Sequence, residues 1–362
     1  MINPDFYIQK SILDVIFAPF INLADYFIAF EHYQFQILSW ISWILYCGII
    51  LAIKKRNLNI IPKSFLLFWF LAIFVLFVRY PGNHLISKDP DQILVDYHSH
   101  TYYSWDGIAS LDRSISYHKA NGFDAFAITE HNLIYPKPIK ETEPVIILGQ
   151  EISKNGIFQL TLNDATVAAL WWQHTSFDEM IKNPITAYEI SNMGHRKIKP
   201  KLGQSNLPKI GVTDWHGWGF RANTWTAVKI PNWKKLTYKE KQTALVDALK
   251  GKYEVTVIEQ KRNEIKNNLR YFFEPFFGLF YILNSQNFVG LLSWFIWALI
   301  AIYLVKFRFF WITTGSTILI FGVKFLITWN SISEYNKSLK TVAISFILIG
   351  LMSILVALKK ER

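Results

Sequence analysis

Long apolar segments near both ends of the chain restrict the folds that are open to it, because in a bilayer only helices and closed barrels satisfy their own backbone groups. Such segments occupy residues 35–53, 64–77, 309–328 and 341–358, and a further one lies within 276–305. About 20 apolar residues in helical conformation cross a membrane. We therefore predict five transmembrane helices, of which the second is short.

The region of residues 11–30 is also apolar, but Asp14, Pro19 and Asp25 interrupt it. Charged groups and proline are costly inside a lipid-facing helix. The pattern leaves two possibilities open, an interfacial helix and a helix packed within a bundle.

The middle of the chain has a different composition and predicts a folded domain between the membrane parts. Hydrophobic residues make up 51% of the 362 residues, yet 18% are charged, which fits neither a purely soluble nor a purely intramembrane protein. Residues 91–260 contain short apolar runs of strand length, Gly and Asn turns, and most of the nine histidines. We predict a membrane region at 1–90, a folded domain at 91–260, and a second membrane region at 261–362.

The net charge of +11 fits membrane topology better than nucleic acid, which we do not expect as a partner. Basic residues gather in cytoplasmic loops of membrane proteins, and here they follow the first span, separate the third from the fourth, and end the chain: Lys54, Lys55, Arg56, Lys63, Lys306, Arg308, Lys359, Lys360 and Arg362. All three places fall on one side of the bilayer. We expect a multi-pass protein of a bacterial-type inner or plasma membrane with its central domain on the extracytoplasmic face, although the basic stretch at 261–270 favours the opposite orientation.

Two histidines one residue apart follow the first apolar run of the central domain, in QILVDYHSH. Side chains alternate in a strand, so His98 and His100 would point to the same face together with Asp96. Two imidazoles at this spacing can bind one metal ion. Surface histidines at this spacing by chance would explain the pair alone.

Other predicted strands end in residues of the same chemical type. FDAFAITEHN ends at His131, PVIILGQE at Glu151, ATVAALWWQH at His174, and KIGVTDWH at Asp214 and His216, while Asp106 follows the first strand in SWDG. A helix is predicted through 108–120, with Asn121 and Gly122 as its stop. In a βα barrel the carboxyl ends of the strands meet at one rim, where such proteins build their sites.

The ordered motifs DYHSH, SWDG, GFDAFAITEHN, GQE, WQH and TDWH resemble the polymerase and histidinol phosphatase (PHP) superfamily of metal-dependent phosphoesterases. The resemblance covers about residues 91–260 and implies an α/β fold, a distorted (β/α)7-type barrel, here inserted between transmembrane helices. It also implies two or three divalent ions, Mn, Fe or Zn. Carried over position by position, their ligands would be His98, His100, Asp106, His131, Glu151, His174, Asp214 and His216, with Glu151 as the bridging carboxylate.

Three features depart from the family pattern. The spacing from HSH to Asp106 is one residue longer than in the family pattern. A further histidine often follows the Glu, whereas this chain offers only Phe158 or Gln159, which leaves the number of ions open. Glu130 stands where the family has Asp, and we expect it to orient neighbouring groups rather than to bind metal. The imidazole and carboxylate ligands, without thiolate, fit Mn, Fe or Zn better than copper or calcium.

These residues predict hydrolysis of a phosphate mono- or diester in a small phosphorylated substrate by a metal-activated water. His195 is a candidate for protonating the leaving group, or an exposed loop histidine. Arg221 is a candidate cation for the phosphate oxygens. A ligand-binding sensor with a degenerate site is the alternative, and a transporter is a third class, for which the spans carry few polar residues.

Overall fold

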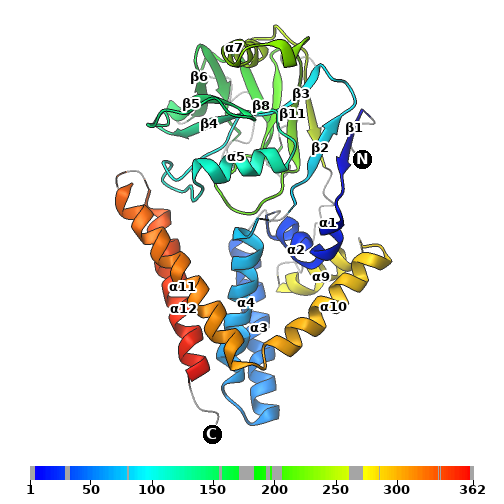
Figure 1. Cartoon of the computed structure of the whole chain (residues 1–362), viewed down its shortest axis with the longest axis vertical. Coiled ribbons are helices and arrows are strands. Elements are labelled where there is room, and N and C mark those ends of the chain that lie inside the picture. Colours follow the sequence, from blue (N-terminus) through cyan, green and yellow to red (C-terminus); the bar gives the residue numbers. More distant parts are fainter. Residues whose placement is uncertain are drawn as a thin grey trace. The chain divides into compact units, whose positions relative to one another are not determined.

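The computed structural model describes residues 5–28, 33–79, 81–154, 157–170, 183–192, 196–197, 206–260, 272–284, 286–332, 334 and 336–358. The chain divides into two compact units. The first comprises residues 1–10 and 81–263, and the second comprises residues 11–80 and 264–362. Figure 1 shows the first unit as a sheet with a few helices and the second as helices alone.

The first unit is built on one mixed ten-stranded sheet with the strand order β10-β8-β7-β6-β5-β4-β3-β11-β12, in which β9 pairs with β8. Its strands are β3 (Gln92–Asp96), β4 (Ala125–His131), β5 (Val145–Lys154), β6 (Ile157–Leu162), β7 (Ala165–Ala168), β8 (Ala187–Asn192), β9 (Arg196–Lys197), β10 (Lys209–Val212), β11 (Thr224–Lys229) and β12 (Val255–Glu259). The strands β3, β4 and β5 are parallel, and so are β7, β8 and β10. The remaining neighbours are antiparallel.

The sheet curls until its two ends approach each other. Strand β10 lies beside β11 and β12, and the Thr226 hydroxyl donates to the Gly211 carbonyl oxygen at 2.7 Å and accepts from the Gly211 amide at 2.9 Å. Gly211 permits this approach, because a Cβ there would lie 2.6 Å from the Thr224 and Val257 side chains. The predicted α/β class with a barrel-like sheet is confirmed, although β5, β6 and β7 follow one another as antiparallel strands without helices between them.

The core of the barrel is apolar and is closed by a helix. Alternate residues of β3, such as Ile93 and Val95, are buried with Val145, Leu160 and other aliphatic residues of the sheet. The same cluster includes Leu245 and Leu249, at the end of helix α7 (Tyr238–Ala248). A capping box between Thr237 and Glu240 begins this helix. The 3-10 helix Trp233–Lys235 precedes it.

Helix α5 (Leu111–Ala120) connects β3 to β4 and confirms the predicted helix and its stop. The Ser110 hydroxyl accepts from the Arg113 amide and caps the first turn. Gly122 has φ +81°, the left-handed conformation that terminates a helix without a steric penalty.

The amino terminus belongs to the first unit, although the sequence placed all of residues 1–90 in a membrane region. Strand β1 (Phe6–Gln9) pairs antiparallel with β2 (His84–Ser87). The two strands bury Phe6 and Leu85. This burial explains why residues 6–9 pair with the first unit and do not join the apolar helices.

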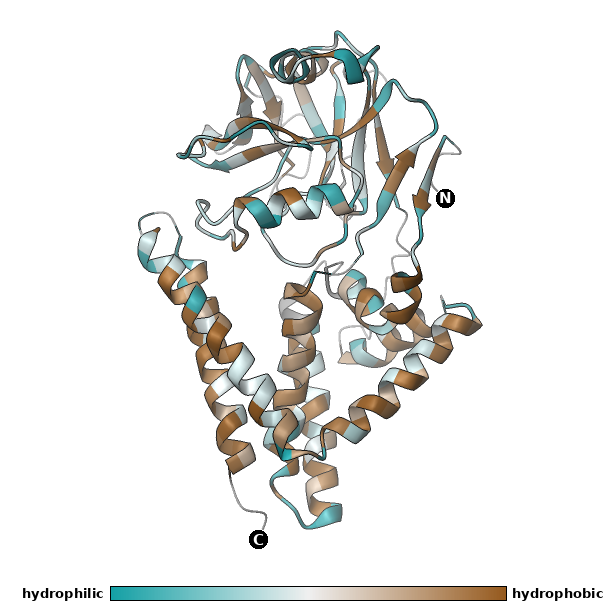
Figure 2. Cartoon of the chain, in the orientation of Figure 1, coloured by the Kyte–Doolittle hydropathy of each residue, from teal (hydrophilic) through white to brown (hydrophobic). Residues whose placement is uncertain are grey.

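The second unit consists of apolar helices: α1 (Ile12–Ile16), α2 (Ala18–Ile28), α3 (Tyr33–Lys55), α4 (Ile60–Phe77), α9 (Glu274–Asn284), α10 (Phe288–Leu304), α11 (Arg308–Ser331) and α12 (Ser338–Leu358). Figure 2 shows hydrophobic residues around these helices. Within the described ranges, four helices are long and apolar enough to cross a membrane, namely α3, α4, α11 and α12. The predicted span within residues 276–305 corresponds to α10, which is apolar but has only 17 residues. A fifth membrane crossing therefore remains a prediction.

The described part of the apolar region, residues 11–28, forms two short helices within the second unit. Helix α2 contacts α4, α9 and α10. At the break between α1 and α2 the Ile16 carbonyl oxygen accepts from the Ser293 hydroxyl at 3.0 Å and from the Trp297 indole at 2.7 Å. These bonds satisfy a helix end that would otherwise be costly in an apolar setting.

Two glycines with the same backbone conformation test the role of close packing around α5. Gly122 and Gly251 both have φ +81°, but a Cβ on Gly122 would overlap the Leu85 backbone, whereas at Gly251 the nearest atom is Pro208 Cγ at 3.8 Å. We expect Gly251→Ala to lower the free energy of unfolding by about 1 kcal/mol from the left-handed conformation alone, and Gly122→Ala to lower it by at least about 2 kcal/mol. Thermal unfolding of the full chain in detergent measures both, and equal losses would contradict this account.

Candidate metal centre

A parallel bridge aligns the two histidine motifs that lie furthest apart in the sequence. Ser99 pairs with Trp215 beyond the ends of β3 and β10, and the His100 amide donates to the Trp215 carbonyl oxygen at 2.9 Å. Side chains that flank paired residues point to the same face of a sheet. The bridge therefore brings His98 and His100 to the face that carries Asp214 and His216.

The register of β4 and β5 adds a third pair. His131 is the last residue of β4 and lies directly opposite Glu151 on β5. The sequence predicted that Glu151 ends its strand. In the structure β5 continues to Lys154 and pairs antiparallel with β6. Asp106 reaches the same place from the loop between β3 and α5.

A first group of donor atoms surrounds the two histidines of the HSH motif. The Nε2 atoms of His98 and His100 are 3.0 Å apart. Asp214 Oδ1 lies 3.3 Å from each of them, and Glu151 Oε2 lies 3.4 Å from His98 Nε2 and 3.5 Å from His100 Nε2. The same Glu151 oxygen is 3.0 Å from His131 Nδ1, which places it between this group and the next.

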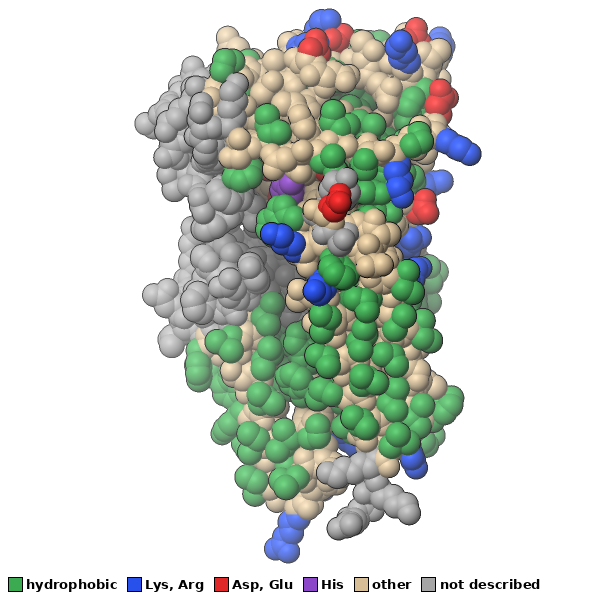
Figure 3. Space-filling model, turned by 90° about the vertical axis from the view of Figure 1, so that its left-hand side faces the viewer, with side chains coloured by type: hydrophobic (Ala, Val, Ile, Leu, Met, Phe, Trp, Pro, Cys, Tyr) green, Lys and Arg blue, Asp and Glu red, His purple; other side chains and the backbone are tan. Residues whose placement is uncertain are grey.

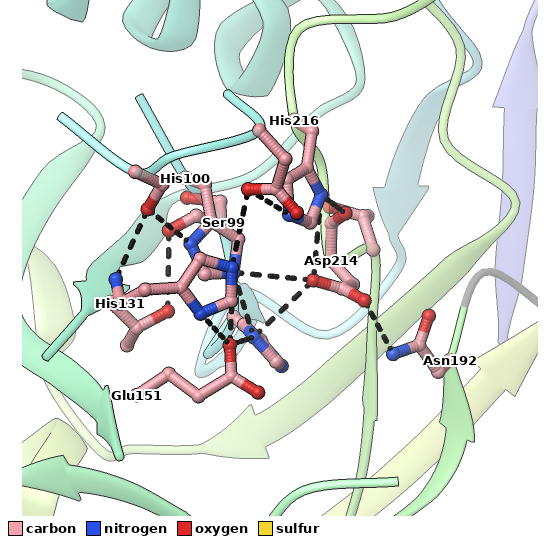
Figure 4. A network of polar contacts seen from close by, with 12 residues as sticks. Ser99, His100, His131, Glu151, Asn192, Asp214 and His216 are labelled. Atoms are coloured by element: carbon pink, nitrogen blue, oxygen red, sulfur yellow. Dashed lines mark hydrogen bonds and ion pairs between the residues drawn. The ribbon is translucent and has the colours of Figure 1, made fainter. Parts of the chain in front are cut away.

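A second group of donors lies around the Asp106 carboxylate. Its Oδ1 atom is 3.2 Å from His131 Nε2 and 3.3 Å from His216 Nε2. All three atoms are buried and have no hydrogen-bond partner of normal geometry among the described residues. Figure 4 shows the side chains of both groups pointing toward one another.

Hydrogen bonds on the far side of each ring determine which nitrogen is free. His98 Nδ1 lies 2.7 Å from Glu189 Oε1, an acceptor, so Nδ1 carries the proton. His100 Nδ1 lies 2.9 Å from Ser104 Oγ, and that hydroxyl donates its own proton to Glu130 at 2.5 Å, so it accepts from His100. In their neutral forms both rings therefore direct an Nε2 lone pair at the other across 3.0 Å, which is repulsive unless a cation lies there.

The electrostatics of the pocket favour positive charge. Burial lowers and the neighbouring carboxylates raise the pKa of the His131 and His216 imidazoles, and the carboxylates prevail, giving values of about 10 and about 9. Burial and the charges of the nearby imidazoles lower the pKa of His100 to about 3. The pKa of the Asp214 carboxyl is raised by burial but lowered more strongly by His98 and His216, so it lies well below its ordinary value. The same carboxylates that favour protonated imidazoles would also attract a divalent cation.

The residues present fit divalent metal ions. Buried lone pairs converge in the two groups described above. The ligand atoms of His98, His100 and Glu151 lie within 4.8 Å of one another, and so do those of His100, His131 and His216. Imidazole and carboxylate ligands without thiolate are typical of Zn, Fe and Mn sites. We identify the two groups as a candidate metal centre.

The structure brings together most of the predicted site residues. The residues that converge are His98, His100, Asp106, His131, Glu151, Asp214 and His216. His174 and His195 lie outside the described residues. Asp96, predicted on the same face, instead accepts from the Thr213 amide at 3.0 Å and contacts His118 Nε2 at 3.1 Å.

Arg221 is placed differently from its prediction as a phosphate ligand. Its guanidinium donates to the Pro81 carbonyl oxygen at 3.4 Å and to Asn83 Oδ1. The Asn83 amide in turn donates to Gln260 Oε1 at 3.1 Å. Arg221 and Asn83 therefore link residues near the two points where the chain enters and leaves the first unit, Pro81 and Gln260.

Sequence reasoning missed several residues that position the candidate ligands. Glu189 is fully buried on β8 and binds both His98 Nδ1 and the Leu170 amide. Asn192, on the same strand, donates to Asp214 Oδ2 at 3.0 Å. A carboxylate inside the apolar strand AYEISN was the available signal, since buried acids are rare unless paired.

Comparisons with known proteins gave one family model and a similar solved structure. A family model described as the PHP domain matches residues 96–271. One solved structure that is similar is described as a two-domain protein containing a predicted PHP-like metal-dependent phosphoesterase, from Bacteroides vulgatus ATCC 8482. It has 15% identity, covers 51% of this chain and 69% of its own, and has a TM-score of 0.30. A search of curated proteins gave no match.

The contact between Glu189 and His98 predicts a loss of metal affinity when the carboxylate is replaced. Glu189→Gln removes the charge that fixes the His98 tautomer, and we expect the affinity for Mn²⁺ or Zn²⁺ to fall about 10- to 100-fold. Competition with a chromogenic chelator measures it. The control is Glu143→Gln, on an exposed loop, and an unchanged affinity in Glu189→Gln would contradict a contribution of the Glu189 charge to metal binding.

Proposed function

We propose that this protein is a membrane-anchored, metal-dependent phosphoesterase that hydrolyses a phosphate mono- or diester. The observation that carries the proposal is the convergence of four imidazoles and three carboxylates on two adjacent points, with Glu151 between them. The PHP-domain match over residues 96–271 supports the same class of activity.

In the proposed reaction a water oxygen forms a bond to phosphorus, the bond from phosphorus to the leaving alcohol breaks, and the alcohol departs with a proton. Two divalent ions would be held by His98, His100, Glu151 and Asp214 in one group and by His131, His216 and Asp106 in the other. When bound, such ions lower the pKa of water and neutralise charge on phosphoryl oxygens.

The chain's own residues would hold these ligands in a fixed geometry. Glu189 and Ser104 accept the Nδ1 protons of His98 and His100, and His216 Nδ1 donates to the Asp214 carbonyl oxygen at 2.7 Å. Asp214 has φ +47°, a conformation that is rare for an aspartate and is found where function requires it. The burial of these groups keeps bulk water away from the ligands.

The substrate is proposed to be a small phosphorylated compound, and the apolar helices of the second unit are proposed to anchor the protein in a bilayer. An envelope metabolite or a lipid head group fits a domain at a membrane, whereas nucleic acid of the cytoplasm does not. His195 remains a proposed proton donor to the leaving group.

A sensor that binds a phosphorylated ligand without hydrolysing it is the alternative. It is favoured by position 159, where Gln159 is buried at 2% exposure and offers an amide rather than a further imidazole. The activity measurement below separates the two functions.

Replacement of Asp214 tests the proposed activity. With added Mn²⁺, the full chain in detergent should hydrolyse a generic phosphate mono- or diester, and Asp214→Ala should lower kcat/KM at least about 100-fold, because the first group loses one of its two carboxylates. Asp164→Ala, at a carboxylate with 70% exposure, is the matched control. Equal trace activity in all three proteins would instead support a sensor.

The orientation in the membrane can be tested with reporters. Figure 1 shows the α3–α4 loop, the α10–α11 loop and the end of α12 at one end of the second unit, and these places carry the basic clusters. We propose that this end is cytoplasmic, so that a reporter fused after Arg362 is active only as a cytoplasmic reporter. A reporter inserted in the β6–β7 turn at Asn163 should show the opposite behaviour, and cytoplasmic activity from both would contradict the proposed topology.

A further inference from the structure

Trp105 is exposed beside the candidate metal centre. Its side chain is 53% exposed, and it directly precedes Asp106, whose carboxylate joins His131 and His216. An exposed indole forgoes a large hydrophobic contribution to stability. Its position at the site therefore calls for a role other than packing.

The loop that carries Trp105 is held in a fixed conformation. The Ser104 amide donates to Thr101 O at 3.1 Å, the Gly107 amide to Ser104 O at 3.3 Å, and the Ile108 amide to His216 O at 2.8 Å. A Cβ at Gly107 would overlap the Thr101 backbone, so only glycine permits this close turn. The exposed indole is thus displayed by a rigid loop that is tied to the site itself.

The indole continues a series of rings that runs through the centre. His216 stacks on His100 with ring centroids 4.2 Å apart and 21° between the planes. His100 stacks on His131 at 4.5 Å and 23°, and the His131 and Trp105 rings are 5.8 Å apart at 30°. Trp105 is the exposed outer member of this series.

A second exposed apolar side chain follows His131 in the sequence. Ile134, three residues after His131, is 53% exposed. Figure 3 shows a histidine side chain at the surface with hydrophobic side chains beside it and charged side chains nearby. A group attached to a phosphate at the centre would meet the Trp105 indole, the exposed ring that lies against His131.

We propose that Trp105 binds a planar aromatic group on the leaving alcohol of the phosphoester, and so determines substrate specificity. The inference rests on the proposed function, because it requires the phosphate at the candidate metal centre. A planar ring can stack on the indole over its whole face, whereas a saturated ring of the same size cannot. The substrate class is then a phosphoester whose leaving alcohol carries a planar aromatic ring close to its hydroxyl group.

The test compares two leaving groups of matched size and reactivity. Benzyl phosphate and cyclohexylmethyl phosphate, each also as the methyl diester, differ in ring planarity but have leaving alcohols of similar acidity. For the full chain in detergent with Mn²⁺, we expect kcat/KM to be about three- to tenfold higher for the benzyl esters. The difference should reside mainly in KM, since stacking binds the ground state and the transition state alike.

Three variants separate a specificity role from a structural one. Trp105→Ala should reduce the benzyl preference to nearly one, and Trp105→Phe should restore most of it. Tyr7→Ala, which removes another exposed aromatic ring of the first unit (48% exposed), should leave the preference unchanged. Equal losses on both esters in Trp105→Ala, or no preference in the unaltered protein, would overturn the inference.

Binding of the non-hydrolysable benzyl and cyclohexylmethyl phosphonates distinguishes failure of this inference from failure of the proposed function. If no ester is hydrolysed but the benzyl phosphonate binds more tightly and Trp105→Ala removes the difference, the subsite stands and the phosphoesterase activity does not. If the two phosphonates bind equally, or neither binds in calorimetry, the subsite is refuted.

Discussion

The candidate site depends on the approach of two imidazole nitrogens, His98 Nε2 and His100 Nε2, to 3.0 Å. Each ring is held by a proton acceptor on its other side, Glu189 for His98 and the Ser104 hydroxyl for His100. When both rings are neutral, two lone pairs at this distance repel each other, and buried unpaired acceptors are costly. Burial lowers the pKa of His98, but the nearby carboxylates raise it more strongly and so favour positive charge here. A cation between them converts the same arrangement from a cost into a binding site.

The barrel is organised to maintain this approach. Asp96, fully buried, accepts from the amides of His98 and Thr213 and so joins the end of β3 to the end of β10. The bridge from Ser99 to Trp215 continues this junction. Trp215 stacks on Tyr117 of α5 with centroids 4.1 Å apart and 8° between the planes, so the helix between β3 and β4 supports the back of the site.

The sequence indicated which residues gather because most of them end or follow a strand, although Glu151 lies within β5 and Asp106 in the loop before α5. Seven of the eight predicted ligands converge in the structure, and the eighth, His174, lies outside the described residues. Glu189 and Asn192 were missed because their roles depend on partners 91 and 22 residues away. The sequence also did not predict strand β6. It pairs antiparallel with β5 and β7, and no helix lies between these strands to mark their boundaries in the sequence.

The most direct test of the account is the metal content of the full-length protein, purified without chelators and measured by elemental analysis beside His100→Gln. The account predicts roughly two ions of Mn, Fe or Zn per chain, and a clear loss of this metal in His100→Gln, which removes a central donor of the first group. A chain that carries no such ion, and takes up none when Mn²⁺, Fe²⁺ or Zn²⁺ is supplied, would contradict it.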